Sequence, residues 1–140
     1  MTNAESAAPQ KDGPRRVAIL GASSSRRKFG NKSVRAHAHA GWEVVPVNPK
    51  AAASGETIEG LAAVGSLVEA GPLDRISVYL PPAVGLAVLP DMAATGAGEV
   101  FFNPGSADRR VLEEARRLGI AAIDACSIVE LGLSPSQFPD

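Results

Sequence analysis

The sequence contains little cysteine, few aromatic residues and no long apolar run. Of its 140 residues only Cys126 is a cysteine, and aromatic residues account for 4%. One cysteine cannot form an internal disulfide, and a lone thiol is typical of a reducing compartment. No run approaches the roughly 20 apolar residues that a membrane span requires. These absences argue against a disulfide-stapled scaffold and a membrane-spanning protein, and they favour the cytoplasm.

Net charge is also nearly absent. The formal net charge is −1, with 45% hydrophobic and 21% charged residues, which is typical of a folded protein. A chain of 140 residues suffices for one domain with its own core. Residues 1–14 are polar, mixed in charge and without the apolar stretch of a signal peptide. We therefore predict a flexible N-terminal tail over residues 1–14 and one domain over residues 15–140.

The charged residues are unevenly distributed along the chain. Residues 1–50 contain nine Lys and Arg against three Asp and Glu, whereas residues 51–140 contain five against twelve. A local excess of positive charge favours a ligand that carries phosphate groups, although a solvated charged surface would give the same pattern. The basic residues are few and lack interleaved aromatic side chains, so we expect no nucleic-acid partner.

Short apolar segments alternate with segments of helical pattern. The apolar segments, which are rich in branched side chains, predict five strands at residues 16–20, 42–47, 74–80, 100–102 and 120–123. Helices are predicted at residues 29–40, 84–95 and 107–118, the last with Ser106 as its N-cap. Pro90 predicts a kink or a new turn inside the second helix. The Ala/Gly-rich residues 51–71 predict an irregular excursion and then a short helix at 66–70.

This alternation predicts an α/β fold: a Rossmann-like, doubly wound parallel sheet of about five strands in the order 3-2-1-4-5, forming a single domain. In such sheets ligands bind beyond the carboxyl ends of the strands, where the strand order reverses. We expect that point between the first and fourth strands. The segments that meet there are rich in Gly, Pro, Asn and Ser; they are residues 21–29, 48–50, 81–82, 103–105 and 124–126.

The loop after the first predicted strand combines Gly21, three serines and three cations ahead of a helix. A helix N-terminus offers unpaired backbone N–H groups and a positive dipole end, which suit a phosphate. The loop lacks both the Gly-x-Gly-x-x-Gly spacing of dinucleotide enzymes and the Walker spacing of nucleotide hydrolases.

The end of the second strand discriminates between nucleotides. Enzymes that use NAD usually place an acid there to hold the ribose hydroxyls. This chain has Val47, Asn48, Pro49 and Lys50, so the acid is missing and a cation is present. A cation suits a phosphorylated ribose, as in NADP or coenzyme A (CoA). An exposed loop lysine without a ligand is the alternative interpretation.

Taken together and in their order along the chain, the strand-end segments described above resemble the stand-alone CoA-binding domain proteins. The resemblance runs from about Arg16 to Leu131, and it extends to the N-terminal part of the succinate–CoA ligase alpha subunit. The first helix departs from the family, because residues 34–40 are not Leu-rich. The segments that carry the resemblance are residues 17–23, 28–31, 47–50, 78–82, 102–106 and 126–130.

The resemblance implies a binding site for CoA or acyl-CoA. In the family the first loop contacts the CoA phosphates, the residues after the second strand line the adenine and 3′-phosphate site, and two later turns flank the diphosphate and pantetheine. In this chain the first loop contributes Gly21, Ala22, Ser23, Ser24, Lys28 and Phe29. The second segment contributes Val47, Asn48, Pro49 and Lys50, and the later turns contribute Pro81, Pro82, Asn103, Pro104 and Gly105.

Candidate catalytic residues are few. His37 and His39 lie two apart on a predicted helix, so they point to different faces and form no shared metal site. The related ligases use a histidine in a later domain, so that chemistry does not carry over, and we expect neither a metal nor catalytic machinery. Cys126 follows the fifth strand on the ligand side. It is either a small buried residue or a thiol that forms a mixed disulfide with CoA.

The sequence leaves three hypotheses for the function. The first is a CoA or acyl-CoA binding protein that acts as carrier, sensor or partner module. The second is an NADP-type nucleotide-binding or redox-sensing domain. The third is a protein-interaction module with a vestigial pocket. Beyond the small-molecule ligand, the expected partners are a second copy of the chain or an unknown protein.

Overall fold

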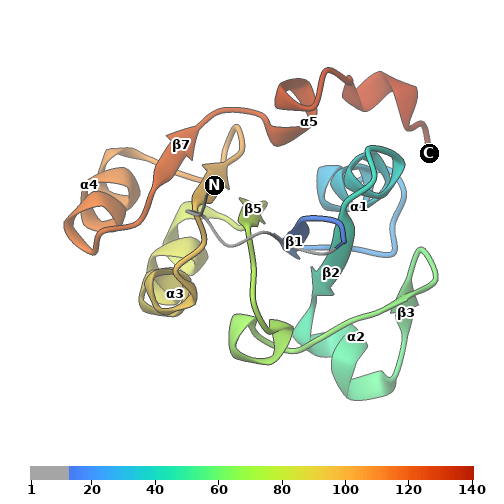
Figure 1. Ribbon diagram of the computed structural model, residues 1–140, viewed down its shortest axis with the longest axis horizontal. Helices are drawn as coiled ribbons and strands as arrows, with labels where there is room; N and C mark the ends of the chain where they lie inside the picture. Colours follow the sequence, from blue (N-terminus) through green and yellow to red (C-terminus); the bar gives the residue numbers. More distant parts are fainter. Residues whose placement is uncertain (1–12) are drawn as a thin grey trace, which may run out of the picture.

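A five-stranded parallel sheet forms the centre of the structure, a computed structural model that describes residues 13–140 (Figure 1). Its inner strands are buried on both faces, which explains their runs of branched apolar residues. The predicted tail lies outside the described residues except for residues 13 and 14. The five strands are β1 (Arg16–Leu20), β2 (Glu43–Val47), β5 (Arg75–Val78), β6 (Glu99–Phe102) and β7 (Ala122–Asp124).

The parallel α/β architecture is confirmed, but the predicted strand order is wrong. The observed order is β2-β1-β5-β6-β7, so the third long strand pairs with β1 instead of lying outside β2. Val64 explains the difference. It forms an isolated parallel bridge with Val47 at the free edge of β2, and the chain then returns to the other side of β1. The order therefore reverses between β1 and β5 rather than between the first and fourth strands, and the expected ligand site moves with it.

The segment between β2 and β5 is more regular than the sequence predicts. Helix α2 (Pro49–Ser54) begins directly after Asn48, whose side chain accepts a hydrogen bond from the Ala51 N–H. Strands β3 (Thr57–Ile58) and β4 (Leu61–Ala62) form a small antiparallel hairpin. The short helix predicted at residues 66–70 is present as the 3₁₀-helix η1 (Leu67–Ala70).

Helices cover both faces of the sheet (Figure 1). Helices α3 (Pro82–Thr95) and α4 (Arg109–Arg117) pack with η1 on one face, around Leu89, Met92 and Val111. Helix α1 (Phe29–His39) packs on the other face through Val34, and α5 (Ser127–Glu130) and η2 (Pro135–Gln137) contact α1. No helix of residues 13–140 is both long and apolar enough to span a membrane.

Two helix details differ from the sequence prediction. Helix α4 is capped by Asp108, whose carboxylate accepts from the Val111 N–H at 3.0 Å. Ser106, the predicted cap, is buried, and its hydroxyl donates to the Asn103 carbonyl at 2.7 Å. Helix α3 continues through Pro90 to its C-cap at Gly96, so the alternative of a new turn at Pro90 is wrong.

A buried arginine organises the amino-terminal edge of the sheet. The Arg75 guanidinium lies 4.5 Å from the ring centroids of both Trp42 and Phe101. Its Nη2 donates to the Glu99 carboxylate at 3.0 Å and to Glu130 at 2.8 Å. Arg75 thus joins β5, β6, α5 and the residue before β2 at the edge opposite to the expected ligand site.

Candidate functional site

Two adjoining cavities lie at the carboxyl ends of the strands. The larger has a volume of about 650 Å³ and the smaller about 340 Å³. They share Gly21, Ala22, Asn48 and Leu80, so together they form one elongated site across the point where the strand order reverses.

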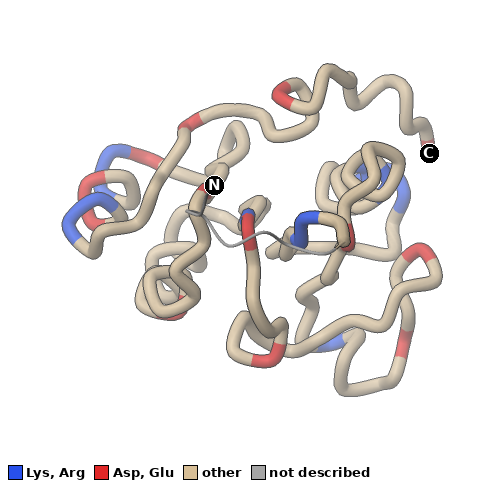
Figure 2. Tube along the Cα trace, viewed as in Figure 1, with Lys and Arg blue, Asp and Glu red and all other residues tan. Residues whose placement is uncertain are grey.

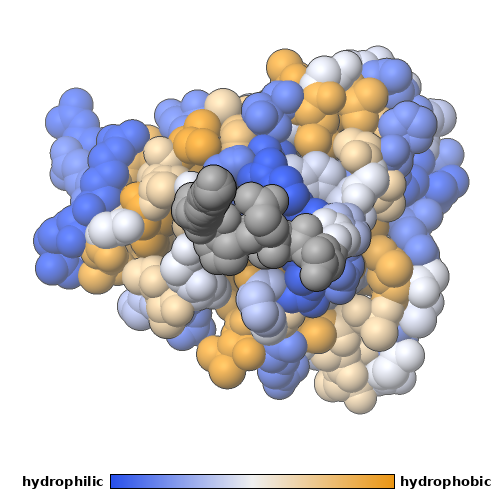
Figure 3. All heavy atoms as spheres, viewed as in Figure 1, coloured by the Kyte–Doolittle hydropathy of each residue, from blue (hydrophilic) through white to orange (hydrophobic). Residues whose placement is uncertain are grey.

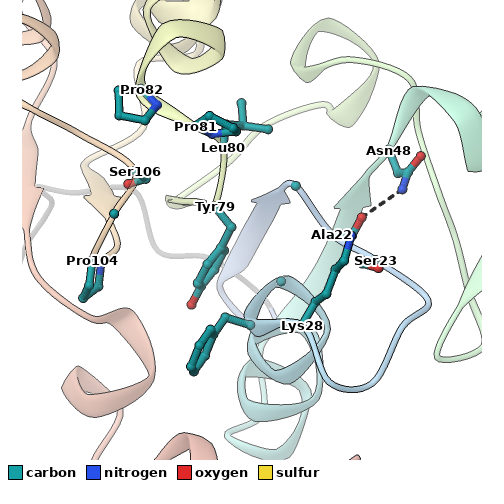
Figure 4. A pocket seen from close by; sticks show the side chains of 14 residues that line it. Ala22, Ser23, Lys28, Asn48, Tyr79, Leu80, Pro81, Pro82, Pro104 and Ser106 are labelled. Carbon is teal, nitrogen blue, oxygen red and sulfur yellow. Dashed lines mark hydrogen bonds between the residues drawn. The ribbon is translucent and has the colours of Figure 1, made fainter.

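Most of the predicted site residues line these cavities. The larger cavity (Figure 4) is lined by Gly21, Ala22, Ser23, Lys28, Phe29, Asn48, Pro81, Pro82, Pro104 and Gly105 from the prediction. The smaller cavity adds Val47 and Pro49. Ser24, Lys50, Asn103 and Cys126 belong to neither lining.

The loop between β1 and α1 packs so closely that two of its positions require glycine. Gly21 has a φ of +87°, and a Cβ there would lie 2.7 Å from the Tyr79 carbonyl oxygen. A Cβ on Gly30 would lie 2.1 Å from the Gly21 carbonyl oxygen. The first turn of α1 is thus pressed against the start of the loop, and its leading N–H groups have no intrahelical partner.

Asn48 links this loop to α2. Its Nδ2 donates to the Ala22 carbonyl at 2.9 Å (Figure 4), while its Oδ1 accepts from the Ala51 N–H at 2.9 Å. One side chain therefore caps a helix and fixes the loop at the place where the two cavities meet.

Four of the basic residues among the first fifty pair with acids that are distant in the sequence. Arg15 pairs with Glu99, and Arg16 pairs with Glu43. Arg26 pairs with Glu59, and Lys32 Nζ lies 3.5 Å from the Asp140 carboxylate. These pairs, spread over the molecule (Figure 2), reduce the basic region that the sequence suggests.

Three cationic side chains near the expected ligand edge form no hydrogen bond or ion pair within residues 13–140: those of Arg27, Lys28 and Lys50. Lys28 lines the larger cavity. Arg27 and Lys50 are exposed, Arg27 beside it in the loop and Lys50 in the first turn of α2 next to Pro49. These are the cations available to an anionic ligand.

Tyr79 forms part of the larger cavity and was missed in the sequence, where it appeared only as a strand residue. Its hydroxyl lies 3.3 Å from Ser127 Oγ. Ser127 Oγ donates its one hydrogen to Asn103 Oδ1 at 3.0 Å, so Tyr79 is the donor to Ser127. Burial raises the pKa of Tyr79 above its ordinary value. The phenol is therefore neutral at physiological pH and offers the cavity an acceptor oxygen.

The side chain of Asn103 forms hydrogen bonds inside the fold. Its side chain is 1% exposed and donates to Ser77 Oγ and to the Val78 carbonyl, both at 2.9 Å. Its Oδ1 also accepts from the Ser127 N–H at 2.8 Å. The side chain joins β5, β6 and α5 behind the cavity wall.

The smaller cavity includes residues that the sequence did not single out. Val84, Val88 and Asp91 follow the i, i+4, i+7 spacing of one face of α3 and form one wall. The facing side contains Ser66 and Leu67 from the segment predicted to be irregular. The helical spacing after Pro81-Pro82 was the available signal for this wall.

The described residues contain no group of three His, Cys, Asp or Glu side chains that could hold a metal ion. His37 is fully buried and His39 is exposed, so the two point to different faces as predicted. Cys126 is partly exposed and precedes α5.

Comparisons with known proteins agree with this architecture. The sequence matches the family described as CoA binding domain over residues 15–132. The structure resembles a conserved hypothetical protein from Pyrococcus furiosus with 31% identity and a TM-score of 0.73, covering 83% of this chain and 98% of that one. A protein from Thermus thermophilus is 29% identical with a TM-score of 0.75, covering 84% and 87% of the two chains.

A larger enzyme shares the fold. The apo form of dinucleotide forming acetyl-coenzyme A synthetase 1 from Ca. Korarchaeum cryptofilum is 22% identical with a TM-score of 0.66, over 81% of this chain but only 26% of the synthetase. No curated protein matched the sequence. Because the family match spans most of the chain and the Pyrococcus furiosus protein is related over nearly its whole length, the chain belongs to the CoA binding domain family.

Proposed function

We propose that this protein binds CoA across both cavities and acts as a carrier, sensor or partner module without catalysis of its own. The observation that carries the proposal is the shape of the site. An apolar cavity of about 340 Å³ opens into a more polar one of about 650 Å³, with a glycine-containing loop at their junction. CoA has the same sequence of parts: a flat base, phosphate groups and a long pantetheine arm.

The adenine would occupy the smaller cavity. Leu20, Val47 and Leu67 give it apolar walls that suit a purine ring. Asp91 is the only charged residue of its lining and has no partner within the described residues. Its carboxylate accepts hydrogen bonds only, so it suits the exocyclic amine of adenine and disfavours a carbonyl at the same position of the ring.

The diphosphate would lie against the β1–α1 loop. The start of α1 supplies unpaired N–H groups, and Lys28 and Arg27 supply positive charge that no acid neutralises among the described residues. Lys50, exposed beside the adenine cavity, is in reach of a phosphate on the ribose. A cation at this place suits the 3′-phosphate of CoA and also the 2′-phosphate of NADP, which makes NADP the second candidate.

The pantetheine arm would follow the larger cavity between two proline-containing turns. Pro81 and Pro82 lie on one side and Pro104 on the other (Figure 4), and Gly105 follows Pro104 in the lining. Phe29 is 57% exposed at this cavity although it is large and apolar. A bound pantetheine or acyl chain would cover it.

Calorimetric titration under reducing conditions with CoA, acetyl-CoA, dephospho-CoA, NADP and NAD tests the proposal. We expect CoA to bind more tightly than dephospho-CoA in the unaltered protein. Lys50→Ala should raise the Kd for CoA about tenfold, a loss typical of one charge-assisted contact, and leave the Kd for dephospho-CoA unchanged. Arg116→Ala, which removes an exposed cation of α4 far from both cavities, is the matched control.

Each alternative predicts a different result. A preference for NADP would assign the site to the second candidate, and binding of none of the five ligands would favour the interaction module. An equal loss of affinity for CoA and for dephospho-CoA in the Lys50→Ala protein would refute the contact of this lysine with the 3′-phosphate.

A further inference from the structure

The β3–β4 hairpin carries an unexpected residue at its turn. Glu59 and Gly60 form a two-residue turn with φ values of +50° and +78°. Such turns favour Asn, Asp or Gly, because left-handed backbone brings a larger side chain too close to the main chain. Glu59 is the only residue other than glycine with positive φ in residues 13–140. The local fold alone would therefore be better served by another residue.

The Glu59 carboxylate reaches the β1–α1 loop. It receives two hydrogen bonds from Arg26, from Nε and Nη2, each at 3.2 Å. It also accepts from Asn31 Nδ2 at 3.0 Å. The acidic tip of the hairpin and the basic loop lie close together in Figure 2. The tip of the hairpin thus contacts the loop in front of α1 through the Glu59 carboxylate.

These contacts continue into the loop backbone. Asn31 is fully buried, and its Nδ2 also donates to the Ser23 carbonyl at 2.9 Å. Its Oδ1 accepts from Arg35 Nε at 2.8 Å, and Arg35 Nη2 donates to the Arg26 carbonyl at 3.0 Å. The backbone from Ser23 to Arg26 is therefore held at both ends by a network that Glu59 closes.

We propose that Glu59 is a positioning residue that holds the β1–α1 loop in its binding geometry before the ligand arrives. This inference rests on the proposed CoA site. Glu59 also keeps Arg26 turned away from the ligand, so that Arg27 and Lys28 are the loop cations that meet the phosphates. A loop already ordered in the free protein loses less entropy on binding, which raises affinity without a direct contact.

The proposal predicts opposite effects on stability and on binding. Glu59→Asn places a residue favoured at this turn but too short to keep both contacts. We expect its melting temperature to equal or exceed that of the unaltered protein, while the Kd for CoA rises about tenfold. Hydrogen exchange in the ligand-free protein should become faster for the amides of residues 23–26 and remain unchanged in β5. A merely structural role would lower stability together with affinity.

Three further variants sharpen the test. Glu56→Asn removes an exposed acid beside the same hairpin and should leave Kd and loop exchange unchanged. Glu59→Gln keeps an acceptor for Asn31 and should give an intermediate loss. Arg26→Gln should weaken binding to a similar extent, and its combination with Glu59→Asn should add little, because both remove the same contact.

Normal CoA affinity and normal loop exchange in the Glu59→Asn protein would overturn the proposal, as would a loss of affinity that follows a loss of stability. Absence of CoA binding in the unaltered protein would refute the proposed function instead. Loop exchange in the ligand-free variants would then still decide whether Glu59 orders the loop.

Discussion

The buried imidazole of His37 predicts a specific pH dependence of stability. The side chain has no exposed surface. Arg75 Nη1 lies 3.3 Å from its Nε2, and since a guanidinium only donates, Nε2 is the acceptor. Its Nδ1 then carries the hydrogen and donates to the Ser33 carbonyl at 2.9 Å. Burial, together with the charge of Arg75, lowers the pKa of His37 from 6.5 to about 4.

The direction of the effect follows from proton binding. In the unfolded chain the pKa of His37 returns to about 6.5, so between pH 4 and 6.5 the unfolded state binds more protons than the native state. Stability is therefore complete above about pH 6.5 and falls as the pH drops toward 4. Between about pH 7.5 and about pH 5, these two pKa values predict a loss of about 2 kcal/mol in the free energy of unfolding.

The carboxylates of Glu99 and Glu59 act at lower pH and do not obscure this window. Burial alone would raise the pKa of Glu99, but hydrogen bonds from Arg75 and Arg15 lower it below 4.5. The hydrogen bond from Asn31 lowers the pKa of Glu59 in the same way. Stability from these groups is present above the ordinary pKa of Glu and is lost only below it.

Urea denaturation followed by circular dichroism at about pH 7.5 and about pH 5 measures the effect. His37→Gln keeps an acceptor for Arg75 and a donor for Ser33 but does not titrate, so its stability should change much less between the two pH values. His39→Gln, on the exposed side of α1, should behave like the unaltered protein. An equal loss in the unaltered protein and in His37→Gln would refute the reasoning.

Four further predictions concern the site and its supports. Gly30→Ala should lower the free energy of unfolding by about 2 kcal/mol and also weaken CoA binding, because its Cβ would lie 2.1 Å from the Gly21 carbonyl oxygen. Gly98→Ala, whose Cβ would lie 3.9 Å from the Asp74 carbonyl oxygen, is the control in chemical denaturation and in ligand titration. Asn103→Ala should cost about 2 kcal/mol in a denaturant titration, since it leaves the buried Ser127 N–H without its acceptor. Asp91→Ala should lose the preference for adenosine over inosine 3′,5′-bisphosphate in competition titrations; an unchanged preference would remove Asp91 from base recognition. With the disulfide of CoA, the Cys126 thiolate should form a mixed disulfide with one CoA and release the other as a thiolate. Mass spectrometry should then detect one added CoA on the unaltered protein and none on Cys126→Ser. Absence of the adduct would leave Cys126 as a packing residue.

The sequence predicted the elements and most of the residues that line the two cavities because both depend on local signals. Apolar runs of branched residues marked the strands, and Gly, Pro, Asn and Ser followed them where the chain leaves the sheet. The strand order does not depend on local signals. It depends on the edge bridge between Val47 and Val64, which a pattern of apolar residues cannot reveal.

Charge and amide roles were also decided by distant partners. The contact of Arg26 with Glu59 joins residues 33 apart, and that of Arg15 with Glu99 joins residues 84 apart, so counting charges along the chain overstated the basic region. Asn103 follows a strand as a ligand residue would, but its amide is used inside the fold. Residue type and position alone did not distinguish these two uses.

On the face shown in Figure 3, apolar side chains are interspersed with hydrophilic ones. Large exposed hydrophobic side chains do occur, among them Val68, Val129 and Phe29. Of these three, only Phe29 lines one of the two cavities at the ligand edge.

The double use of Asn48 restricts how the nucleotide preference of this fold can change. Its Nδ2 donates to the Ala22 carbonyl at 2.9 Å. An aspartate at this position, the kind of residue that reads the ribose hydroxyls in NAD enzymes, would still cap α2 but would set a carboxylate oxygen against that carbonyl, with no hydrogen between them. A change of preference from CoA to NAD would therefore require a rebuilt β1–α1 loop as well as the new acid. Asn48→Asp alone should weaken CoA binding without creating NAD binding.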